Sequence, residues 1–166
     1  MVNLVQLIAL LGCGVMWLWW QRKAYANLQE TGSRQTTHSP GWSIGWWFIP
    51  FMNLVRPYQV HKELLLRSQT RNVRANEPTT SSSLVSWWWG LLMVGSFLSN
   101  AVARFQFRAE SIDELKVLTS MSMAEDALSA VTAVLAIKLI AAISAAQTSM
   151  AIEIPSSPRT SQEVVA

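Results

Sequence analysis

Three long apolar runs are the feature that most constrains the fold of this chain. They lie at residues 2–20, 84–103 and 127–146, and each has the roughly 20 residues that a helix needs to cross a bilayer. A lipid-exposed segment must satisfy its backbone hydrogen bonds internally, and a helix does so within one run. The sequence therefore predicts an all-α fold, an integral membrane helical bundle with three spanning helices.

The composition supports a membrane location. Hydrophobic residues make up 51% of the 166 residues and charged residues only 14%, whereas about a quarter of an average soluble domain is charged. The net charge of +3 comes from basic residues between the apolar runs, mixed with acids, so we predict no nucleic-acid partner. The single cysteine, Cys13, excludes an internal disulfide and a thiolate metal cluster.

The first run has the boundary of a spanning helix. It ends in three tryptophans followed by Arg22-Lys23, an order that places this end at a membrane interface. A signal peptide is the alternative, but the run lacks a basic segment before it and a small-residue cleavage site after it. Residues 31–33, Thr-Gly-Ser, predict the end of a helix and the start of a loop.

The segment 42–56 is apolar but too short for a plain span. Pro50 and Pro57 each remove a backbone donor and disfavour helix at the preceding residue, so we expect breaks at Ile49 and Arg56. The prediction is a short, kinked segment that is intramembrane or interfacial and does not cross. Such a break needs protein partners for its freed carbonyls, so other helices should pack around it.

A surface helix is predicted over residues 57–71. Pro57 is well placed in its first turn. Val60 and Leu64 share one face, whereas Lys62 lies on another. This pattern fits a helix lying along the membrane surface, and the alternative is an ordinary amphipathic helix packed on protein.

The distribution of basic residues predicts the topology. If 42–56 does not cross, one side holds Arg22, Lys23, Arg34, Arg56, Lys62, Arg67, Arg71, Arg74 and Arg159, and the other holds Arg104, Arg108 and Lys116. A crossing segment splits the same residues evenly, so the positive-inside rule favours the non-crossing arrangement. We predict a multi-pass membrane protein with its N-terminus outside and residues 21–83 and the C-terminus cytoplasmic. Residues 1–150 form one membrane domain, and 151–166 form a flexible tail.

An ordered motif runs through the central segment. It consists of Pro40-Gly41-Trp42, Gly45-Trp46-Trp47-Phe48-Ile49-Pro50, Asn53-Leu54 and Arg56-Pro57-Tyr58-Gln59, followed by Glu63. The motif resembles the hallmark of the bacterial domain-of-unknown-function (DUF) 4328 membrane family, and residues 23–28, 87–88 and 98–100 extend the resemblance over most of 20–145. Members usually carry another hydrophobic helix before the first run, which this chain lacks.

The resemblance implies an architecture in the bacterial inner (cytoplasmic) membrane but no chemistry, since the family has no established activity. Ten motif residues are the resulting candidates for a structural or interaction site: Trp42, Gly45, Trp46, Trp47, Pro50, Asn53, Arg56, Pro57, Tyr58 and Glu63. We expect the prolines and the paired tryptophans among them to face the bundle.

Catalytic and cofactor sites are weakly indicated. No serine or cysteine has a recognisable base partner and no glycine-rich phosphate loop is present, so no enzyme is predicted. His61 is a weak candidate for a haem or pigment ligand, because protein metal sites need three or four ligands and no second histidine lies at ligand spacing. We predict no cofactor and no metal.

Charged residues at the last run suggest an ion pair. Ser111 and Glu114 have the spacing of a capping box, which predicts a helix start. Asp126, at the start of the last run, is the predicted partner of Arg104 at the outer end of the bundle. The alternative is that Arg104 reaches lipid phosphate. Lys138 lies within the run and can extend its charge towards the nearer interface.

The function predicted from these features is that of a non-enzymatic accessory, scaffolding or interaction subunit. Its expected partners are the lipid bilayer and other membrane proteins, or a second copy of the chain. One alternative is a small transporter or lipid-handling protein with a cavity lined by the broken helix. Another is a cofactor- or pigment-binding subunit of an electron-transfer or light-harvesting complex, with His61 as ligand.

Overall fold

The computed structural model describes residues 4–30, 36–70, 78–106 and 111–152, and within these ranges the chain forms helices and no strand. The elements are α1 (Leu4–Glu30), α2 (Pro40–Gly45), the 3₁₀ helices η1 (Trp46–Phe48) and η2 (Met52–Leu54), α3 (Arg56–Ser68), α5 (Ser83–Gln106) and α6 (Ile112–Ile152). The all-α prediction is confirmed. Most of the predicted tail, residues 153–166, lies outside the described residues.

The predicted apolar runs lie within α1, α5 and α6. Among the described residues, one helical stretch, Ile112–Met150 of α6, is both long and apolar enough to cross a membrane. Only 17% of its most apolar window is buried inside the protein. That α1, α5 and α6 each cross a membrane stays a prediction. The last helix is twice as long as its predicted span, because it begins with the capping box, in which Glu114 N–H donates to Ser111 Oγ at 3.2 Å and Ser111 N–H to Glu114 Oε2 at 3.0 Å.

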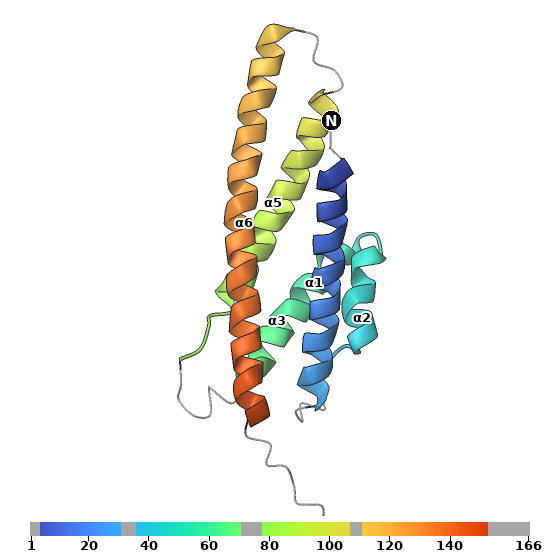
Figure 1. Ribbon diagram of the computed structural model, residues 1–166, viewed down its shortest axis with the longest axis vertical. Coiled ribbons are helices and arrows are strands. Elements are labelled where there is room, and N and C mark those ends of the chain that lie inside the picture. Colours follow the sequence, from blue (N-terminus) through green and yellow to red (C-terminus); the bar gives the residue numbers. More distant parts are fainter. Residues whose placement is uncertain (1–3, 31–35, 71–77, 107–110, 153–166) are drawn as a thin grey trace, which may run out of the picture.

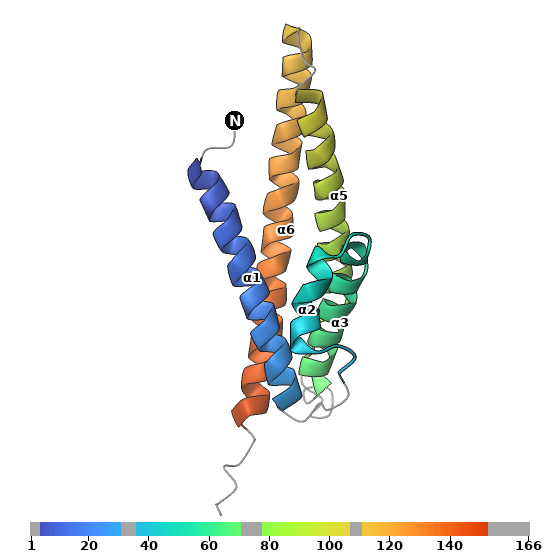
Figure 2. The same cartoon turned by 90° about the vertical axis from the view of Figure 1, so that its right-hand side faces the viewer.

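The long helices form an elongated bundle with a shorter hairpin beside it (Figures 1 and 2). Helices α5 and α6 run antiparallel side by side, and α1 leans away from both towards its N-terminus. The elements α2, η1, η2 and α3 form the hairpin, which rises along part of the bundle and returns (Figure 2). The C-terminal ends of α1, α3 and α6 therefore lie towards the same end of the bundle, and α5 begins in the same half.

Local chemistry explains how the hairpin starts. Ser39 is the N-cap of α2, with extended backbone and its hydroxyl accepting from Trp42 N–H at 3.3 Å. Pro40 follows in the first turn, where its missing N–H is not needed. The entry into the hairpin is thus specified by two adjacent residues.

The predicted breaks lie close to the prolines. Ile49 is extended at φ −95° and ψ 117° and ends η1, which confirms the first break. Phe51 then has φ 65° and ψ −38°, and Met52 N–H donates to Pro50 O at 2.8 Å, so residues 50–52 form a strained γ-turn. The second break needs a correction of one residue: Val55 leaves the helical region, and Arg56 begins α3 because Pro57 is tolerated in a first turn.

The core lies where α3 fills the space between α1, α5 and α6. Its fully buried apolar side chains are Tyr25, Leu28, Val60, Leu64, Leu65, Val85, Leu139 and Ile143. The apolar face of α3 is thus covered by protein, which agrees with the alternative reading of this amphipathic helix. The side chain of Gln147 in α6 also donates to Ala24 O at 2.7 Å and to Ser68 Oγ at 3.2 Å. These contacts join three helices at one end of the bundle.

Candidate functional site

Three indole rings surround His61 where the hairpin meets α1 and α5, an arrangement we call the His61 cage. The His61 ring stacks on Trp17 of α1 with centroids 5.3 Å apart and 25° between the planes. Trp88 of α5 lies 4.9 Å away at 56°, and Trp47 of η1 lies 6.3 Å away, edge-on at 84°. His61 has no exposed surface. One residue from each of four elements therefore builds this cluster.

The backbone of α3 sets the tautomer of His61. Its Nδ1 lies 2.7 Å from Pro57 O, which can only accept, so Nδ1 carries the proton and Nε2 carries the lone pair. Burial lowers the pKa of His61 to about 4, so the ring is neutral near pH 7. Nε2 is buried without a hydrogen-bond partner in the described part of the chain, and so are the indole nitrogens of Trp17 and Trp46. The cage is a packed aromatic core with unused polar atoms.

A metal role for this histidine has little support in the geometry. A neutral imidazole whose Nδ1 is held by a carbonyl is the form that ligates metals through Nε2. However, the described residues contain no group of three or more His, Cys, Asp or Glu side chains that could hold an ion. The axial-ligand role of His61 stays a hypothesis, and what the structure establishes is its place in the core.

Gln21 of α1 fastens the hairpin to the bundle. Its side chain is fully buried, its Nε2 donates to Ser43 O at 2.6 Å, and its Oε1 accepts from Trp47 Nε1 at 3.0 Å. On the other side, Trp89 Nε1 of α5 donates to Leu54 O at 3.0 Å. Helices α1 and α5 thus supply partners for the polar groups of the broken segment, as expected for a break of this kind. Gln21 is not among the site residues predicted from the sequence, although a polar amide between an apolar run and two cations is a signal for it.

Glu63 of α3 is the centre of a second polar group, the Glu63 network. Its Oε2 accepts from the Tyr25 hydroxyl at 2.7 Å, and its Oε1 accepts from Thr37 N–H at 2.8 Å, Thr37 Oγ1 at 3.0 Å and Arg67 Nε at 2.8 Å. Tyr25 Oη in turn accepts from His38 N–H at 3.1 Å. The network therefore joins three parts of the chain: helix α1, helix α3, and residues 37–38, which precede α2.

The network fixes the charge of its members. Burial alone raises the pKa of Glu63, but the hydrogen bonds from Thr37 and Tyr25 and the charge of Arg67 outweigh it, and the net pKa is lowered. Burial, and then the bond to Glu63, raise the pKa of Tyr25 well above its usual value. A carboxylate and a neutral phenol therefore face each other at neutral pH.

A match to a family model decides the family of the chain. The motif residues Trp47 and Glu63 and the upstream Tyr25 join α1 to the hairpin through the bonds just described, and the model of the family described as "Domain of unknown function (DUF4328)" matches residues 1–145. The chain belongs to the DUF4328 family. A search of curated proteins and one of solved structures found no match.

Other DUF4328 motif residues support the hairpin locally. A Cβ at Gly45 lies 3.1 Å from Trp42 Cε3, so a larger residue there displaces the indole. The ring centroids of Trp42 and Trp46 lie 4.8 Å apart. The Arg56 guanidinium lies over the Trp46 ring, 5.2 Å from its centroid. Asn53 N–H donates to Ile49 O at 3.0 Å across the break.

Two prolines and two tryptophans of the motif are predicted to face the bundle, and three of these four residues do so. Trp46 and Trp47 are half-buried against the core, and Pro57 is buried. Pro50 is exposed, because it lies at the γ-turn where the hairpin reverses. Tyr58, another motif residue, places its hydroxyl 3.1 Å from Ser86 Oγ of α5.

The tip of the DUF4328 hairpin is apolar and outward-facing. Phe51 is 85% exposed and Phe48 is 72% exposed, and the neighbouring Met52, Leu54 and Val55 are exposed as well. Large apolar side chains gathered on a turn are characteristic of a surface that meets lipid or another protein. The strained backbone at Phe51 therefore presents a hydrophobic tip.

Arg104 and Asp126 are not brought together. Both are exposed, and the ion pairs among the described residues do not include one between them. A Cβ at Gly95 lies 3.6 Å from Leu128, so these two residues are level in the antiparallel pair of α5 and α6. Arg104, nine residues after Gly95, is therefore level with Thr119, nine residues before Leu128. Asp126 lies seven residues further along α6, about 10 Å away along the axis. The early start of α6 causes this offset.

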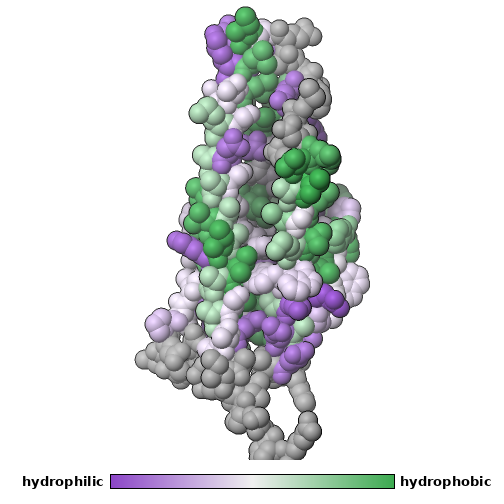
Figure 3. All heavy atoms as spheres, in the orientation of Figure 1, coloured by the Kyte–Doolittle hydropathy of each residue, from purple (hydrophilic) through white to green (hydrophobic). Residues whose placement is uncertain are grey.

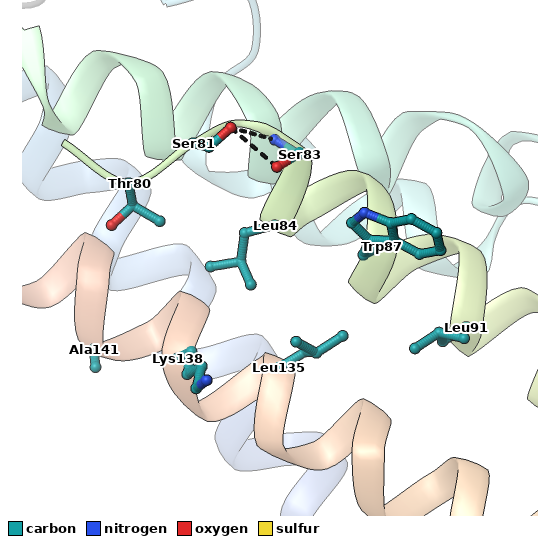
Figure 4. A pocket seen from close by; sticks show the side chains of 9 residues that line it. All are labelled: Thr80, Ser81, Ser83, Leu84, Trp87, Leu91, Leu135, Lys138 and Ala141. Atoms are coloured by element: carbon teal, nitrogen blue, oxygen red, sulfur yellow. Dashed lines mark hydrogen bonds between the residues drawn. The ribbon is translucent and has the colours of Figure 1, made fainter.

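Two of the cavities lined by described residues lie on the flanks of the DUF4328 bundle. One, of about 440 Å³, adjoins the Glu63 network and is lined by Thr37, Gln59 and Lys62 among others. The other, of about 610 Å³, lies between α5 and α6 and includes Lys138 (Figure 4). Residues 42–56 line neither of these two cavities.

Proposed function

We propose that this DUF4328 protein is a non-enzymatic integral membrane protein that acts as an interaction or scaffolding subunit. The observation that carries the proposal is the first half of α1. Every described side chain from residue 4 to residue 16 is exposed, including Val5 at 77% and Met16 at 71%. A helix that is apolar all round needs cover from lipid or from protein.

The position of this helix half favours a protein partner. It leans away from α5 and α6, and none of the described helices runs alongside it (Figure 2). The opposite half of α1 is held by Gln21 and Tyr25, so the free half projects from an anchored base. We propose that α1 packs against a helix of another membrane protein or of a second copy.

The bilayer is the second expected surface. Hydrophobic residues, green in Figure 3, cover much of α1 and α6 on the face shown. The proposed topology has three spanning helices, α1, α5 and α6, in the bacterial inner membrane with the N-terminus outside. The hairpin enters from the cytoplasmic side, and its exposed tip at Phe51 meets lipid there without crossing.

Site-specific crosslinking in native membranes tests the interaction. A photoreactive residue at Ile8, which is exposed, should crosslink to a defined membrane protein that mass spectrometry identifies, whereas the same residue at the buried Leu28 should give only intramolecular products. Equal and diffuse crosslinking from both positions, or lipid adducts alone from Ile8, would contradict an interaction role for α1.

Cysteine labelling on intact cells tests the topology. In a Cys13→Ser background, cysteines at Glu30 and Thr79 should be protected from an impermeant reagent, and one at Ser111 should react. Glu30 ends α1 and Thr79 precedes α5, both in one half of the bundle, whereas Ser111 precedes α6, which begins at the opposite end (Figure 1). Opposite accessibility of Glu30 and Thr79 would show that the hairpin region crosses.

A further inference from the structure

The cavity between α5 and α6 is a groove with a polar end. Ser81 and Ser83, at the start of α5, line this end together with Thr80 (Figure 4). Ser81 Oγ accepts from Ser83 Oγ at 3.0 Å and from Ser83 N–H at 3.3 Å, so its own hydroxyl hydrogen is free to donate outward. Hydroxyl donors are therefore gathered where α5 begins.

Lys138 of α6 adds a positive charge at the same level. It lies ten residues after Leu128, which places it opposite Val85 in the antiparallel pair. Within the described part of the chain, Lys138 forms no ion pair and no hydrogen bond through its side chain. A cation on a membrane helix is costly unless it finds a partner or reaches the interface. The charge of Lys138 is therefore available to a binding partner from outside the chain.

The rest of the groove is apolar. Leu84, Trp87 and Leu91 follow one another along α5, and Leu135 faces them from α6 (Figure 4). Trp87 is 68% exposed, which is typical of an indole at the level of lipid headgroups. The groove thus changes from polar to apolar along the helix axes, in the direction that a lipid molecule is oriented in a bilayer.

We propose that this groove binds an anionic phospholipid. The phosphate lies at the polar end, where Lys138 supplies the charge and the hydroxyls of Ser81 and Thr80 supply hydrogen bonds. An acyl chain lies along Leu91 and Leu135. Basic pockets between membrane helices bind anionic headgroups through this combination of charge and depth. The inference rests on membrane insertion of α5 and α6 and does not require the proposed interaction role of α1.

The two ends of the groove distinguish a phospholipid from other anions. Free phosphate has no use for the apolar end, and a zwitterionic lipid offers its phosphate together with a positive charge that opposes Lys138. The volume of about 610 Å³ lies within the range of small-molecule sites. An anionic headgroup with an attached chain matches the charge and the apolar surface together.

Native mass spectrometry of the full chain in detergent tests this proposal. The protein is titrated with phosphatidylglycerol or with phosphatidylcholine of the same acyl chains. We expect phosphatidylglycerol to bind more tightly, and Lys138→Gln to weaken it about fivefold, since one cation near a membrane surface contributes about that factor. Lys138→Arg should retain binding. Lys23→Gln, which removes another exposed lysine of the chain, should leave binding unchanged.

The remaining outcomes overturn the proposal. Equal binding of the two lipids, or equal weakening by Lys138→Gln and Lys23→Gln, means that the protein has a general charge preference and no site at Lys138. Displacement of the lipid by inorganic phosphate at matched concentration means that the polar end binds the free anion alone. Since Lys138 is exposed, its substitution should not alter the melting temperature, which confirms that each variant is folded.

Discussion

The bond between Tyr25 and Glu63 should be measurable as a coupling free energy. Tyr25 is fully buried and donates to Glu63 Oε2 at 2.7 Å. A hydrogen bond to a charged group contributes about 1.5–3 kcal/mol, and Tyr25→Phe also leaves His38 N–H without its acceptor. We therefore expect Tyr25→Phe to lower the free energy of unfolding by about 2–3 kcal/mol. For a chain of this size that is a loss of about 4–12 °C in melting temperature.

A double-mutant cycle isolates the pair. Tyr25→Phe and Glu63→Gln together should destabilise by about 1–2 kcal/mol less than the sum of the single changes. The measurement is thermal unfolding in mild detergent, followed by tryptophan fluorescence. Tyr58→Phe is the matched control. Among the described residues the Tyr58 hydroxyl is hydrogen-bonded to the exposed Ser86 hydroxyl alone, so the variant should lose less than about 1 kcal/mol.

The same pair predicts a pH dependence. The pKa of Glu63 is lowered in the folded state, so its stabilisation is fully present above the unfolded pKa near 4.5 and is lost as the pH falls through the folded pKa. The loss on acidification should be smaller in Glu63→Gln, which has no proton to take up. Additive single losses, or an acid limb that persists unchanged in Glu63→Gln, would refute this interpretation of the network.

Three further substitutions give distinct results in the same unfolding assay. Trp47→Ala should cost about 3–5 kcal/mol because it removes a large ring packed on the core, whereas Trp19→Ala, at an exposed position, should cost less than about 1 kcal/mol. Phe51→Gly should raise stability by up to about 1 kcal/mol relative to Phe51→Ala, since only glycine adopts φ 65° without strain; a lower melting temperature for the glycine variant would contradict the γ-turn. Arg104→Asp and Asp126→Arg should give additive effects within about 0.5 kcal/mol, because the two side chains lie apart along the bundle; recovery in the double variant would place them together.

The sequence by itself determined the features that depend on neighbouring residues. Apolar runs predicted the helices, the Ser111 and Glu114 capping box predicted the start of α6, and Pro50 predicted the break at Ile49. Each of these is decided within about four residues, because helix caps and proline act on the backbone next to them. The second break shifted by one residue for the same reason, since a first helical turn accepts Pro57.

Only the tertiary structure decided which side chains meet. Gln21 reaches Ser43 and Tyr25 reaches Glu63 across 22 and 38 residues of sequence, and His61 is enclosed by rings from α1, η1 and α5. Neither spacing nor composition encodes such pairs, because they follow from how helices slide and rotate against one another. The register of α5 on α6 likewise separated Arg104 from Asp126 and placed Lys138 beside the start of α5, since packing between helices is set by side chains far apart in the chain.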